Sequence, residues 1–505
     1  MDDPSLIIIG GGFAGLSAGI YAQMNGYQTH IYEMGGVPGG LCTAWQRKGY
    51  TIDGCVHWLV GSSPRSSLHR LWSEVGLMQG RQFVDLDQYM RFEGADGRTF
   101  IVYTDADRLE QHMLALSPDD AAITRRFIDG IRLGIAYDRL QVLKSDNKLQ
   151  RAAKRLRMGL LMVRKAQDLQ IWLRTTAEEF ANRFADPLIR QALLEMWFPE
   201  FSMFFLLFTL AYLHNHNASY PLGGSLPMSH ALETRYLGLG GQIHYHSKVE
   251  KILVENDQAV GLRLADGQEV RAGRVISAAD GYNTIFKLLD GKYTDEKVRE
   301  PYEKWPPFPP LLFVGLGVKR TFEDVPQTVS GISFQLREAV EIGDKLWEFL
   351  PVHIYNHDPA LAPAGKTSLV VMLPSSYQYW KEFAQDQAAY EEKKQQVARI
   401  IVNVLEQRFP GIAEDVEMVD VATPLTFERY TGNWQGSFEG WLITPQNSQT
   451  VMRPMSQSLP GLANFLMCGQ WVEPGGGLPT ALISGRRAIQ ALCKEDGKVF
   501  GSSLP

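Results

Sequence analysis

The sequence predicts an α/β protein with a Rossmann-like nucleotide-binding domain, and three observations carry that prediction. Residues 6–9, Leu-Ile-Ile-Ile, form a wholly apolar strand of the kind that is buried on both faces in a parallel sheet. A glycine-rich turn follows directly, and residues 16–24 then have a helical pattern. Another glycine-rich turn leading into a helix lies near the C-terminal end of the chain, in residues 467–486. We therefore expect a discontinuous nucleotide-binding domain.

The first turn carries the spacing Gly10-x-Gly12-x-x-Gly15. We expect Gly10 to turn the chain off the strand, Gly12 to let the backbone approach a diphosphate, and Gly15 to let the helix pack close to the sheet. Phe13 and Ala14 lie at the helix N-terminus, whose free N–H groups attract phosphate. The alternative interpretation is an ordinary glycine turn in an α/β domain.

A carboxylate in the right place favours the nucleotide-binding interpretation. The strand predicted at residues 29–33 ends in Glu33, 18 residues after Gly15. A dinucleotide fold needs an acceptor there for the ribose hydroxyls of the adenosine half.

Bulk composition limits the other function classes. A chain of 505 residues is long enough for several domains, and its net charge of −6 gives no reason to expect a nucleic-acid partner. The four cysteines have no CxxC spacing, so we expect no disulfide framework, zinc site or dithiol centre, and a reducing compartment. The sequence shows no secretory leader and no apolar run of the ~20 residues that span a bilayer, which predicts a cytoplasmic protein.

After Glu33 comes a second glycine-rich turn, and with it a family resemblance. The turn runs from Met34 through Gly39, Gly40 and Leu41 to a short strand at residues 50–54. An acidic strand end followed by a Gly-Gly turn separates flavoproteins from plain NAD dehydrogenases. Here the sequence resembles the phytoene desaturase, carotenoid isomerase and retinol saturase family of FAD-dependent oxidoreductases, although Leu41 stands where that family usually has Arg or Ser.

The resemblance continues at the C-terminal end and implies FAD as the cofactor. Three consecutive glycines, residues 475–477, precede a helix, which lets the backbone touch a planar ring and places a helix N-terminus near the reduced flavin. Gln470 stands where related flavoproteins usually have Asp. In residues 239–280 the chain resembles the family's return to the FAD domain, where the backbone next to Val249 meets the adenine. The FAD-binding residues predicted in these two later regions are Val249, Gly469, Gln470, Gly476, Gly477, Leu478, Pro479 and Thr480.

The same resemblance predicts the domain organisation. The FAD-binding domain would comprise residues 1–80, 221–289 and 451–505. A mixed-sheet substrate domain would comprise residues 81–105 and 290–450, and a helical insertion residues 106–220. A hairpin around Asp96-Gly97, strands at 311–318 and 368–373 and a helix at 390–408 fit the substrate domain.

The helical insertion suggests contact with lipid. Between residues 144 and 165, eight Lys or Arg side chains stand against a single acid, Asp146, while Leu149, Ala153, Leu156, Leu160 and Val163 fall on one helical stripe. Such a basic amphipathic helix can lie on an anionic bilayer surface, so we expect peripheral membrane contact through residues 144–165. A solvated charged face on a core-packed helix is the alternative. The aromatic run at residues 201–213 is typical of a core, but the resemblance also permits a substrate channel there.

Few residues offer acid–base chemistry. His57 is the one titratable side chain that we place near the flavin ring, as a catalytic candidate, with a structural histidine as the simpler interpretation. Three histidine pairs, 214/216, 244/246 and 353/357, have spacings compatible with metal ligands, but none has a nearby third ligand, so we predict no metal.

These observations predict an FAD-dependent oxidoreductase that desaturates, saturates or isomerises a carotenoid-like or other long apolar isoprenoid substrate. One alternative is a redox-neutral cis–trans polyene isomerase that uses reduced FAD, and another is a flavin amine oxidase. A third belongs to a different class: the Rab escort and GDP-dissociation-inhibitor proteins resemble this fold and bind prenylated proteins without flavin.

Overall fold

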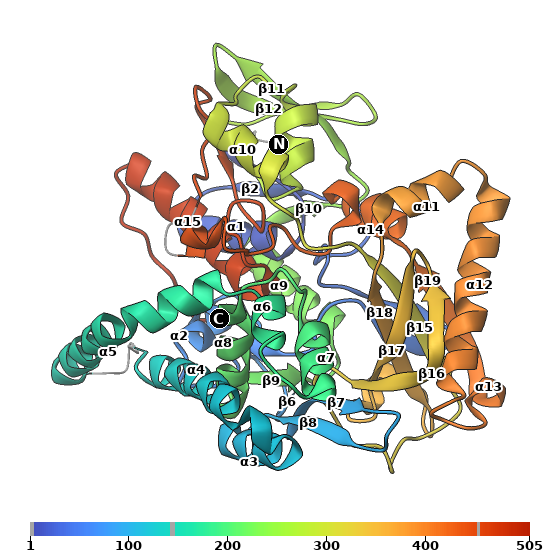
Figure 1. Cartoon of the computed structure of the whole chain (residues 1–505). Helices are drawn as coiled ribbons and strands as arrows, with labels where there is room; N and C mark the ends of the chain where they lie inside the picture. Colours follow the sequence, from blue (N-terminus) through green and yellow to red (C-terminus); the bar gives the residue numbers. More distant parts are fainter. Residues whose placement is uncertain (1–4, 142–146, 452–454) are drawn as a thin grey trace.

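The centre of the molecule is a five-stranded parallel sheet formed by distant parts of the chain (Figure 1). The computed structural model describes residues 5–141, 147–451 and 455–505. Across the sheet the strands are β10 (Gln242–His244), β2 (Thr29–Tyr32), β1 (Leu6–Ile9), β14 (Val275–Ser277) and β20 (Phe465–Met467). Ile8 is paired with Ile31 on one side and Ile276 on the other. The first strand therefore lies between β2 of its own predicted segment and β14 of the second segment, and β20 of the third segment follows β14 at the edge of the sheet.

The apolar first strand is buried because both faces of this sheet are covered. Leu6 and Ile8 belong to a core with the helices α1 (Phe13–Met24), α9 (Ser225–Gly238) and α15 (Gly477–Glu495). Ile7 and Ile9 pack in a second core with the antiparallel sheet of β11 (Val249–Glu255), β12 (Gln258–Leu264) and β13 (Glu269–Arg271). A strand buried on both faces has no polar alternation, which is the pattern that residues 6–9 show.

A seven-stranded mixed sheet forms the second large layer. Its order is β19 (Val416–Ala422), β15 (Leu311–Val318), β18 (Thr367–Pro374), β17 (Lys345–Ile354), β16 (Ile332–Ile342), β7 (Gln88–Glu93) and β8 (Thr99–Tyr103). Only β16 and β7 are parallel neighbours. The helices α11 (Tyr377–Phe383), α12 (Gln387–Leu405), α13 (Ile412–Asp415) and α14 (Pro424–Thr431) lie beside it (Figure 1).

A short hairpin connects the two large sheets. Its strands are β3 (Ala44–Arg47) and β4 (Tyr50–Asp53). A Cβ atom at Gly315 would lie 2.8 Å from the Ile52 side chain, and one at Gly317 would lie 2.5 Å from the Tyr50 ring. These two glycines of β15 therefore let the hairpin, which follows the Gly39-Gly40 turn, pack directly on the mixed sheet.

The region between β8 and β9 (Ala218–Pro221) is helical. It contains α3 (Ala106–Leu116), α4 (Ala121–Arg139), α5 (Lys148–Arg174), α6 (Ala177–Ala181), α7 (Pro187–Met196) and α8 (Met203–His214). Helix α8 packs closely on α4, and α5 projects from the body of the molecule (Figure 1). The remaining α-helices and β-strands of the described residues are α2 (Ser67–Glu74), α10 (Glu296–Lys304) and two short strands that pair with β9, namely β5 (Leu59–Val60) and β6 (Phe83–Val84).

The apolar stripe of α5 is exposed, so the core-packed alternative is wrong for this stripe, whereas the half-buried Leu161 and Met162 pack against the core of the helical insertion. Leu149, Leu156, Leu160 and Val163 are 82%, 66%, 49% and 78% exposed. The buried side chains, Leu169 and Trp172, lie near its C-terminal end. Lys144 and Asp146 lie outside the described residues.

The predicted fold class is confirmed, whereas the predicted domain boundaries stay predictions. Strand β15 covers the residues expected for it, and the Asp96-Gly97 hairpin is formed by β7 and β8. Helix α1 begins at Phe13, three residues earlier than its pattern indicates, because its first turn contains Gly15. Within the described ranges, no helix combines the length and the apolarity that a membrane crossing requires.

Candidate functional site: a two-ended glycine cradle

The N-terminal turn can only be built from glycine. Gly10 has a φ of +95°, and its N–H donates to the Tyr32 carbonyl at 2.8 Å. A Cβ atom at Gly15 would lie 2.0 Å from the Gly10 carbonyl oxygen. Gly12 caps α1 without any side-chain hydrogen bond, which leaves the helix N-terminus open to an anionic group. Phe13 and Ala14 are buried beneath this turn, with Ala14 facing the C-terminal end of the chain.

Glu33 joins the two N-terminal turns. Its carboxylate accepts hydrogen bonds from the backbone N–H groups of Gly11 and Gly35, each at 2.6 Å. The segment that leads to Val249 runs alongside, because Ser247 N–H donates to the Glu33 carbonyl at 2.8 Å. Val249 itself is buried against the core that contains Tyr32. Charge, backbone donors and the predicted adenine-facing segment therefore meet at the end of β2.

The Gly39-Gly40 turn lies directly against the first turn. Gly39 N–H donates to the Gly11 carbonyl at 2.9 Å, and a Cβ atom at Gly40 would lie 3.3 Å from the Cα of Gly12. Leu41 is half-buried at the end of this turn. Met34 begins the segment, and its Sδ lies 3.4 Å from where a Cβ atom at Gly432 would be. Two turns without side chains thus face each other at the N-terminus of α1.

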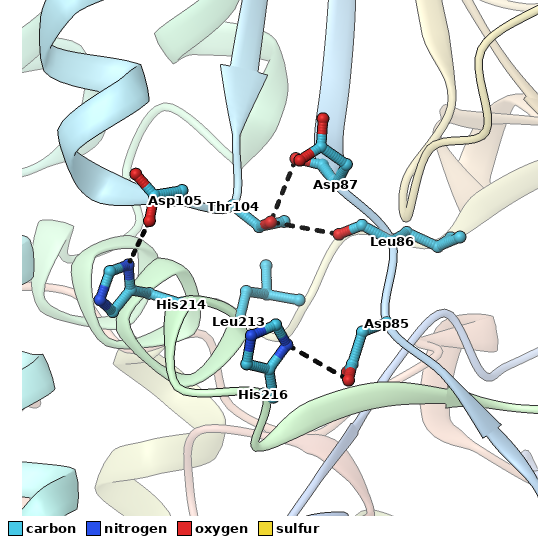
Figure 2. A pocket seen from close by; sticks show the side chains of 8 residues that line it. All are labelled: Asp85, Leu86, Asp87, Thr104, Asp105, Leu213, His214 and His216. Atoms are coloured by element: carbon cyan, nitrogen blue, oxygen red, sulfur yellow. Dashed lines mark hydrogen bonds and ion pairs between the residues drawn. The ribbon is translucent and has the colours of Figure 1, made fainter.

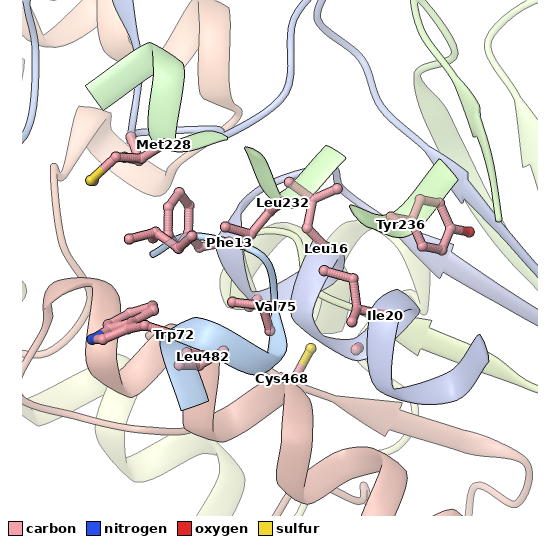
Figure 3. Packing of buried hydrophobic residues seen from close by; sticks show 14 of the residues in the cluster. Phe13, Leu16, Ile20, Trp72, Val75, Met228, Leu232, Tyr236, Cys468 and Leu482 are labelled. Atoms are coloured by element: carbon pink, nitrogen blue, oxygen red, sulfur yellow. The ribbon is translucent and has the colours of Figure 1, made fainter. Parts of the chain in front are cut away.

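The C-terminal motif folds back onto this place. Gly469 has a φ of +106°, and a Cβ atom there would lie 3.5 Å from the Ala14 side chain. Gln470 is half-buried, with its amide nitrogen 3.4 Å from the Asn433 side-chain oxygen. Helices α1 and α15 pack on each other, and Phe13 and Leu16 of α1 and Leu482 of α15 belong to the core drawn in Figure 3.

Helix α15 begins at the glycine run. Gly476 is its N-cap and has no side-chain capping bond, while the Thr480 hydroxyl donates to the carbonyls of Gly476 and Gly477 at 2.8 Å. Pro479 lies in the first turn, and Leu478 is half-buried against the main core. The N-cap of this helix, like that of α1, is a glycine without a side chain.

The residues present fit FAD. The two ends of the chain meet, as the Gly469–Ala14 contact shows, and a Cβ at Gly12 would enter the space beside the Gly39 carbonyl, 3.7 Å away. A carboxylate at one end and two helix N-termini without side-chain caps suit ribose hydroxyls, a diphosphate and the electron-rich edge of a flavin. The individual contacts of the predicted residues with FAD stay predictions.

Glu439 is a site residue that the sequence did not reveal, because no motif surrounds it. Its Oε2 would lie 1.8 Å from a Cβ atom at Gly476, and the φ of +70° at Gly476 favours glycine at that position. Burial raises the pKa of Glu439 to about 8, against a hydrogen bond from the Gly477 backbone that lowers it. This carboxyl group therefore sits at the N-terminus of α15 and is mostly protonated at neutral pH.

His57 lies beyond the Gly39-Gly40 turn, beside a histidine from the mixed sheet. Its ring centroid is 4.8 Å from that of His353, and its Nδ1 has no hydrogen-bond partner. Burial and the charge of His357 lower the pKa of His57 to about 4, so the ring is neutral at pH 7. A catalytic role for His57 stays a prediction.

Four aromatic residues, Trp58, Trp197, Phe201 and Phe205, form a continuous wall. The successive ring centroids are 6.3 Å, 4.8 Å and 4.9 Å apart. Phe205 ends the wall 3.3 Å from where a Cβ atom at Gly475 would be. The aromatic wall therefore runs from the neighbour of His57 to the glycine run before α15, and part of the aromatic run of the insertion borders the site instead of only filling a core.

The histidine pairs do not form metal sites in the described part of the chain. His214 and His216 each face a different carboxylate at a surface pocket, Asp105 at 3.5 Å and Asp85 at 3.2 Å (Figure 2). His244 Nε2 is 3.1 Å from His30 Nδ1, and the His244 ring stacks on the Tyr32 ring. Among the residues described, no group of three His, Cys, Asp or Glu side chains is arranged to hold a metal ion.

Two cysteines that are scattered in the sequence lie opposite each other. The β3–β4 register pairs Ala44 with Asp53, and Gly54 N–H donates to the Thr43 carbonyl, which brings residues 42 and 55 across from one another. A hydrogen bond with Cys42, followed by burial, raises the pKa of the Cys55 thiol well above its usual range. Both thiols are free. Sequence spacing alone could not reveal this neighbourhood.

Comparison with known proteins agrees with this geometry. The chain matches the family described as flavin containing amine oxidoreductase over residues 13–493 and belongs to that family. It is 27% identical to a phytoene desaturase (neurosporene-forming) from Cereibacter sphaeroides, over 96% of this chain and 93% of the relative. It is 24% identical to a chloroplastic prolycopene isomerase from Daucus carota, over 95% and 78% of the two chains.

Solved structures share the fold. Cyclohexylamine oxidase from Brevibacterium oxydans superimposes with a TM-score of 0.61 at 13% identity, over 98% of this chain and 100% of its own. An oxidoreductase from Methanosarcina mazei superimposes with a TM-score of 0.58 at 17% identity, over 96% of this chain and 99% of its own. The protein is thus an FAD-dependent oxidoreductase, and the predictions of the cofactor and of an enzyme are confirmed.

Proposed function

We propose that this enzyme desaturates, saturates or isomerises a carotenoid-like or other long apolar isoprenoid compound. The aromatic wall is the structural observation that carries the proposal, because it connects the helical insertion to the glycine run at α15. The names of the relatives, phytoene desaturases and prolycopene isomerases, support the same substrate class.

FAD supplies the redox step when bound, and the protein supplies position and a dry environment. Gly12, Glu33 and the Gly39-Gly40 turn would hold the adenosine diphosphate half, and residues 469–480 the flavin half. A polyene offers no acidic proton or leaving group, so stacking along the aromatic wall matters more than a strong base. Trp58 and Phe205, the two half-buried ends of the wall, would orient the apolar chain and exclude water beside the glycine run.

The direct test uses flavin absorbance. The purified protein should carry or bind FAD. Anaerobic addition of an acyclic polyene in detergent should bleach oxidised FAD if the enzyme desaturates the polyene, and should reoxidise pre-reduced FAD if the enzyme saturates it. Absence of bindable flavin would overturn the proposal. Rapid bleaching by simple primary amines, with no response to polyenes, would instead favour an amine oxidase.

Redox-neutral isomerisation is a second candidate, favoured by the likeness to prolycopene isomerases. In that case pre-reduced FAD under anaerobic conditions should convert cis to trans polyene with no net flavin oxidation. A product with a changed number of double bonds, in stoichiometric amounts with flavin reduction, would favour the desaturase instead.

We also propose that α5 rests on an anionic membrane surface. Its exposed leucines and valine lie on a helix that carries Lys148, Arg155, Arg157, Arg164 and Lys165, so one element combines apolar and cationic side chains. An apolar face with flanking cations is the composition of interfacial helices. A long apolar substrate dissolved in a bilayer would reach the enzyme from that surface.

Vesicle sedimentation tests this contact. The full-length protein should sediment with phosphatidylserine-containing vesicles, less at high salt because salt screens the cationic side chains. The variant Leu149→Gln/Leu156→Gln/Val163→Gln should lose most of the binding. The control Leu346→Gln, also at an exposed leucine but on β17, should bind as the wild type does. Equal sedimentation of both variants would contradict the proposal.

A further inference from the structure

A cluster of polar rings lies buried at the far end of the aromatic wall. We define the imidazole–phenol cluster as His57, His353, Tyr355 and His357. The His353 ring centroid lies 4.8 Å from that of His57 and 4.1 Å from that of Tyr355, and His357 is 6.0 Å from both His353 and Tyr355. His57 follows β4, His353 lies near the end of β17, and Tyr355 and His357 follow β17. The segment after the β3–β4 hairpin and the end of β17 therefore meet here.

The cluster has polar atoms without partners. His353 and Tyr355 are each 2% exposed and His357 is 8% exposed. Nevertheless His57 Nδ1, the Tyr355 hydroxyl and both ring nitrogens of His353 and of His357 lack hydrogen-bond partners. The Ser330 backbone offsets part of the lowering of the His353 pKa, but neither nitrogen of that ring has a hydrogen bond of regular geometry. Buried polar groups are normally paired, so these atoms are available to a polar ligand.

The chemistry of the cluster restricts that ligand to a neutral oxygen group. Burial, offset at His357 by Asp358, lowers the pKa of the His357 imidazole to about 4, so it is neutral near pH 7, as is His57. A neutral imidazole offers one donor and one acceptor, and a phenol offers both, which suits a hydroxyl or carbonyl group. Asp358 is buried beside them, where it accepts from Tyr220 at 2.9 Å and Gly223 at 2.8 Å. With this carboxylate and no cation in the cluster, a ligand carboxylate would be repelled.

The cluster is also in the right place for the substrate. Trp58 continues from His57 into the aromatic wall, which ends at Gly475. An apolar chain that lies along the wall would therefore bring one of its ends toward the cluster. A pure hydrocarbon could form no hydrogen bond with these polar atoms, whereas a hydroxyl or carbonyl oxygen could form hydrogen bonds with several of them.

We propose that the imidazole–phenol cluster binds a hydroxyl or carbonyl oxygen of the substrate, so that the enzyme prefers an oxygenated polyene to a hydrocarbon. The inference rests on the proposed function, which it narrows to one substrate class.

The test compares matched ligands on the FAD-loaded, full-length protein. An acyclic polyene hydrocarbon, its terminal alcohol and its terminal aldehyde are titrated in detergent micelles, and binding is followed by quenching of tryptophan fluorescence. The wild type should bind the alcohol or the aldehyde ~10-fold or more tightly than the hydrocarbon, because a site built for a hydrogen bond rejects the analogue that lacks it. The variants Tyr355→Phe and His357→Phe should lose that preference while their affinity for the hydrocarbon and their flavin content stay unchanged.

The controls distinguish a failure of this inference from a failure of the proposed function. Tyr137→Phe removes a phenol in the helical insertion, away from the cluster, and should keep the preference. Tyr355→Phe changes one oxygen atom only, so it carries the test if His357→Phe does not fold. Equal affinity of the wild type for all three ligands, or a preference that survives in both variants, would overturn the inference and leave the proposed function standing. Failure of every polyene to bind or to bleach the flavin would overturn the proposed function itself.

Discussion

Single side chains set the polarity at the two ends of the candidate FAD site, which the Gly10–Gly15 and Gly39-Gly40 turns form at one end and residues 469–477 at the other. At one end Glu33 accepts two short backbone hydrogen bonds, and at the other Glu439 lies against Gly476. The first carboxylate ends a strand whose apolar run and distance from Gly15 were visible in the sequence. The second comes from a segment without any motif and reaches the site only through folding.

Replacing Glu33 with Ala should weaken FAD binding by ~10-fold or more, because hydrogen bonds to charged groups contribute about 1.5–3 kcal/mol each. In this variant the Gly11 and Gly35 N–H groups lose the carboxylate that accepts their hydrogen bonds, and the ribose hydroxyls of FAD lose their expected acceptor. Titration of the apoprotein, followed by flavin fluorescence, measures the effect. Glu250→Gln, an exposed glutamate on the neighbouring β11, is the control. Unchanged affinity in Glu33→Ala would remove Glu33 from the cofactor site.

Glu439 should make stability depend on pH. Its pKa rises from about 4.3 in the unfolded chain to about 8 in the folded protein, so between these values the folded state binds more protons. The contribution of this residue to the free energy of unfolding is therefore present below pH ~4.3 and is lost as pH rises to ~8. Urea midpoints at pH 5.5 and 8.5 should show a smaller decrease in Glu439→Gln than in the wild type. Parallel decreases would contradict the assignment.

At the scale of elements, glycine decides which helices approach closely. On α4, a Cβ atom at Gly134 would lie 2.8 Å from the Ala211 side chain of α8, and one at Gly130 would lie 2.7 Å from Leu207. Helix α5 also contains a glycine, Gly159, but nothing lies within 4 Å of its Cβ position. The hydrophobic pattern predicted helices in both places, yet it could not tell a packed helix from a projecting one.

The same substitution should have opposite effects at these two positions. Gly134→Leu should lower the free energy of unfolding by about 1–3 kcal/mol, because overpacking pushes α4 from α8. Gly159→Leu should raise it by up to about 1 kcal/mol, because leucine is a better helix former than glycine and meets no neighbour. Urea unfolding of both variants provides the comparison, and a similar loss in both would show that α5 is packed.

For the molecule as a whole, the close packing of the N-terminal helix α1 on the C-terminal helix α15 is essential. We call this contact the joint. A Cβ atom at Gly485 of α15 would lie 2.4 Å from the Ala14 carbonyl oxygen and 2.8 Å from the Ala18 nitrogen of α1. Both are backbone atoms, which cannot rotate away. The two glycine clusters share one site because of this contact.

Gly485→Ala should therefore reduce both stability and FAD affinity. We expect a loss of about 1–3 kcal/mol in the free energy of unfolding, as for other overpacked cores, together with weaker flavin binding as α15 moves from α1. Thermal unfolding and flavin titration measure the two effects. Gly238→Ala has open space at its Cβ position and serves as the control. A variant that loses stability but keeps its FAD affinity would show that the joint does not shape the site.

Short sequence patterns were enough to predict the local parts of this protein: a buried strand, two glycine-rich turns, an acid at a strand end and a cofactor class. These follow from backbone sterics and from periodicity, which act over a few residues and leave a visible pattern. The tertiary structure alone decided that Cys42 faces Cys55, that Glu439 reaches Gly476, that the stripe of α5 stays exposed and that His57 joins His353 across about three hundred residues of chain. Burial and apposition are properties of packing between distant segments, so no short stretch of sequence carries them.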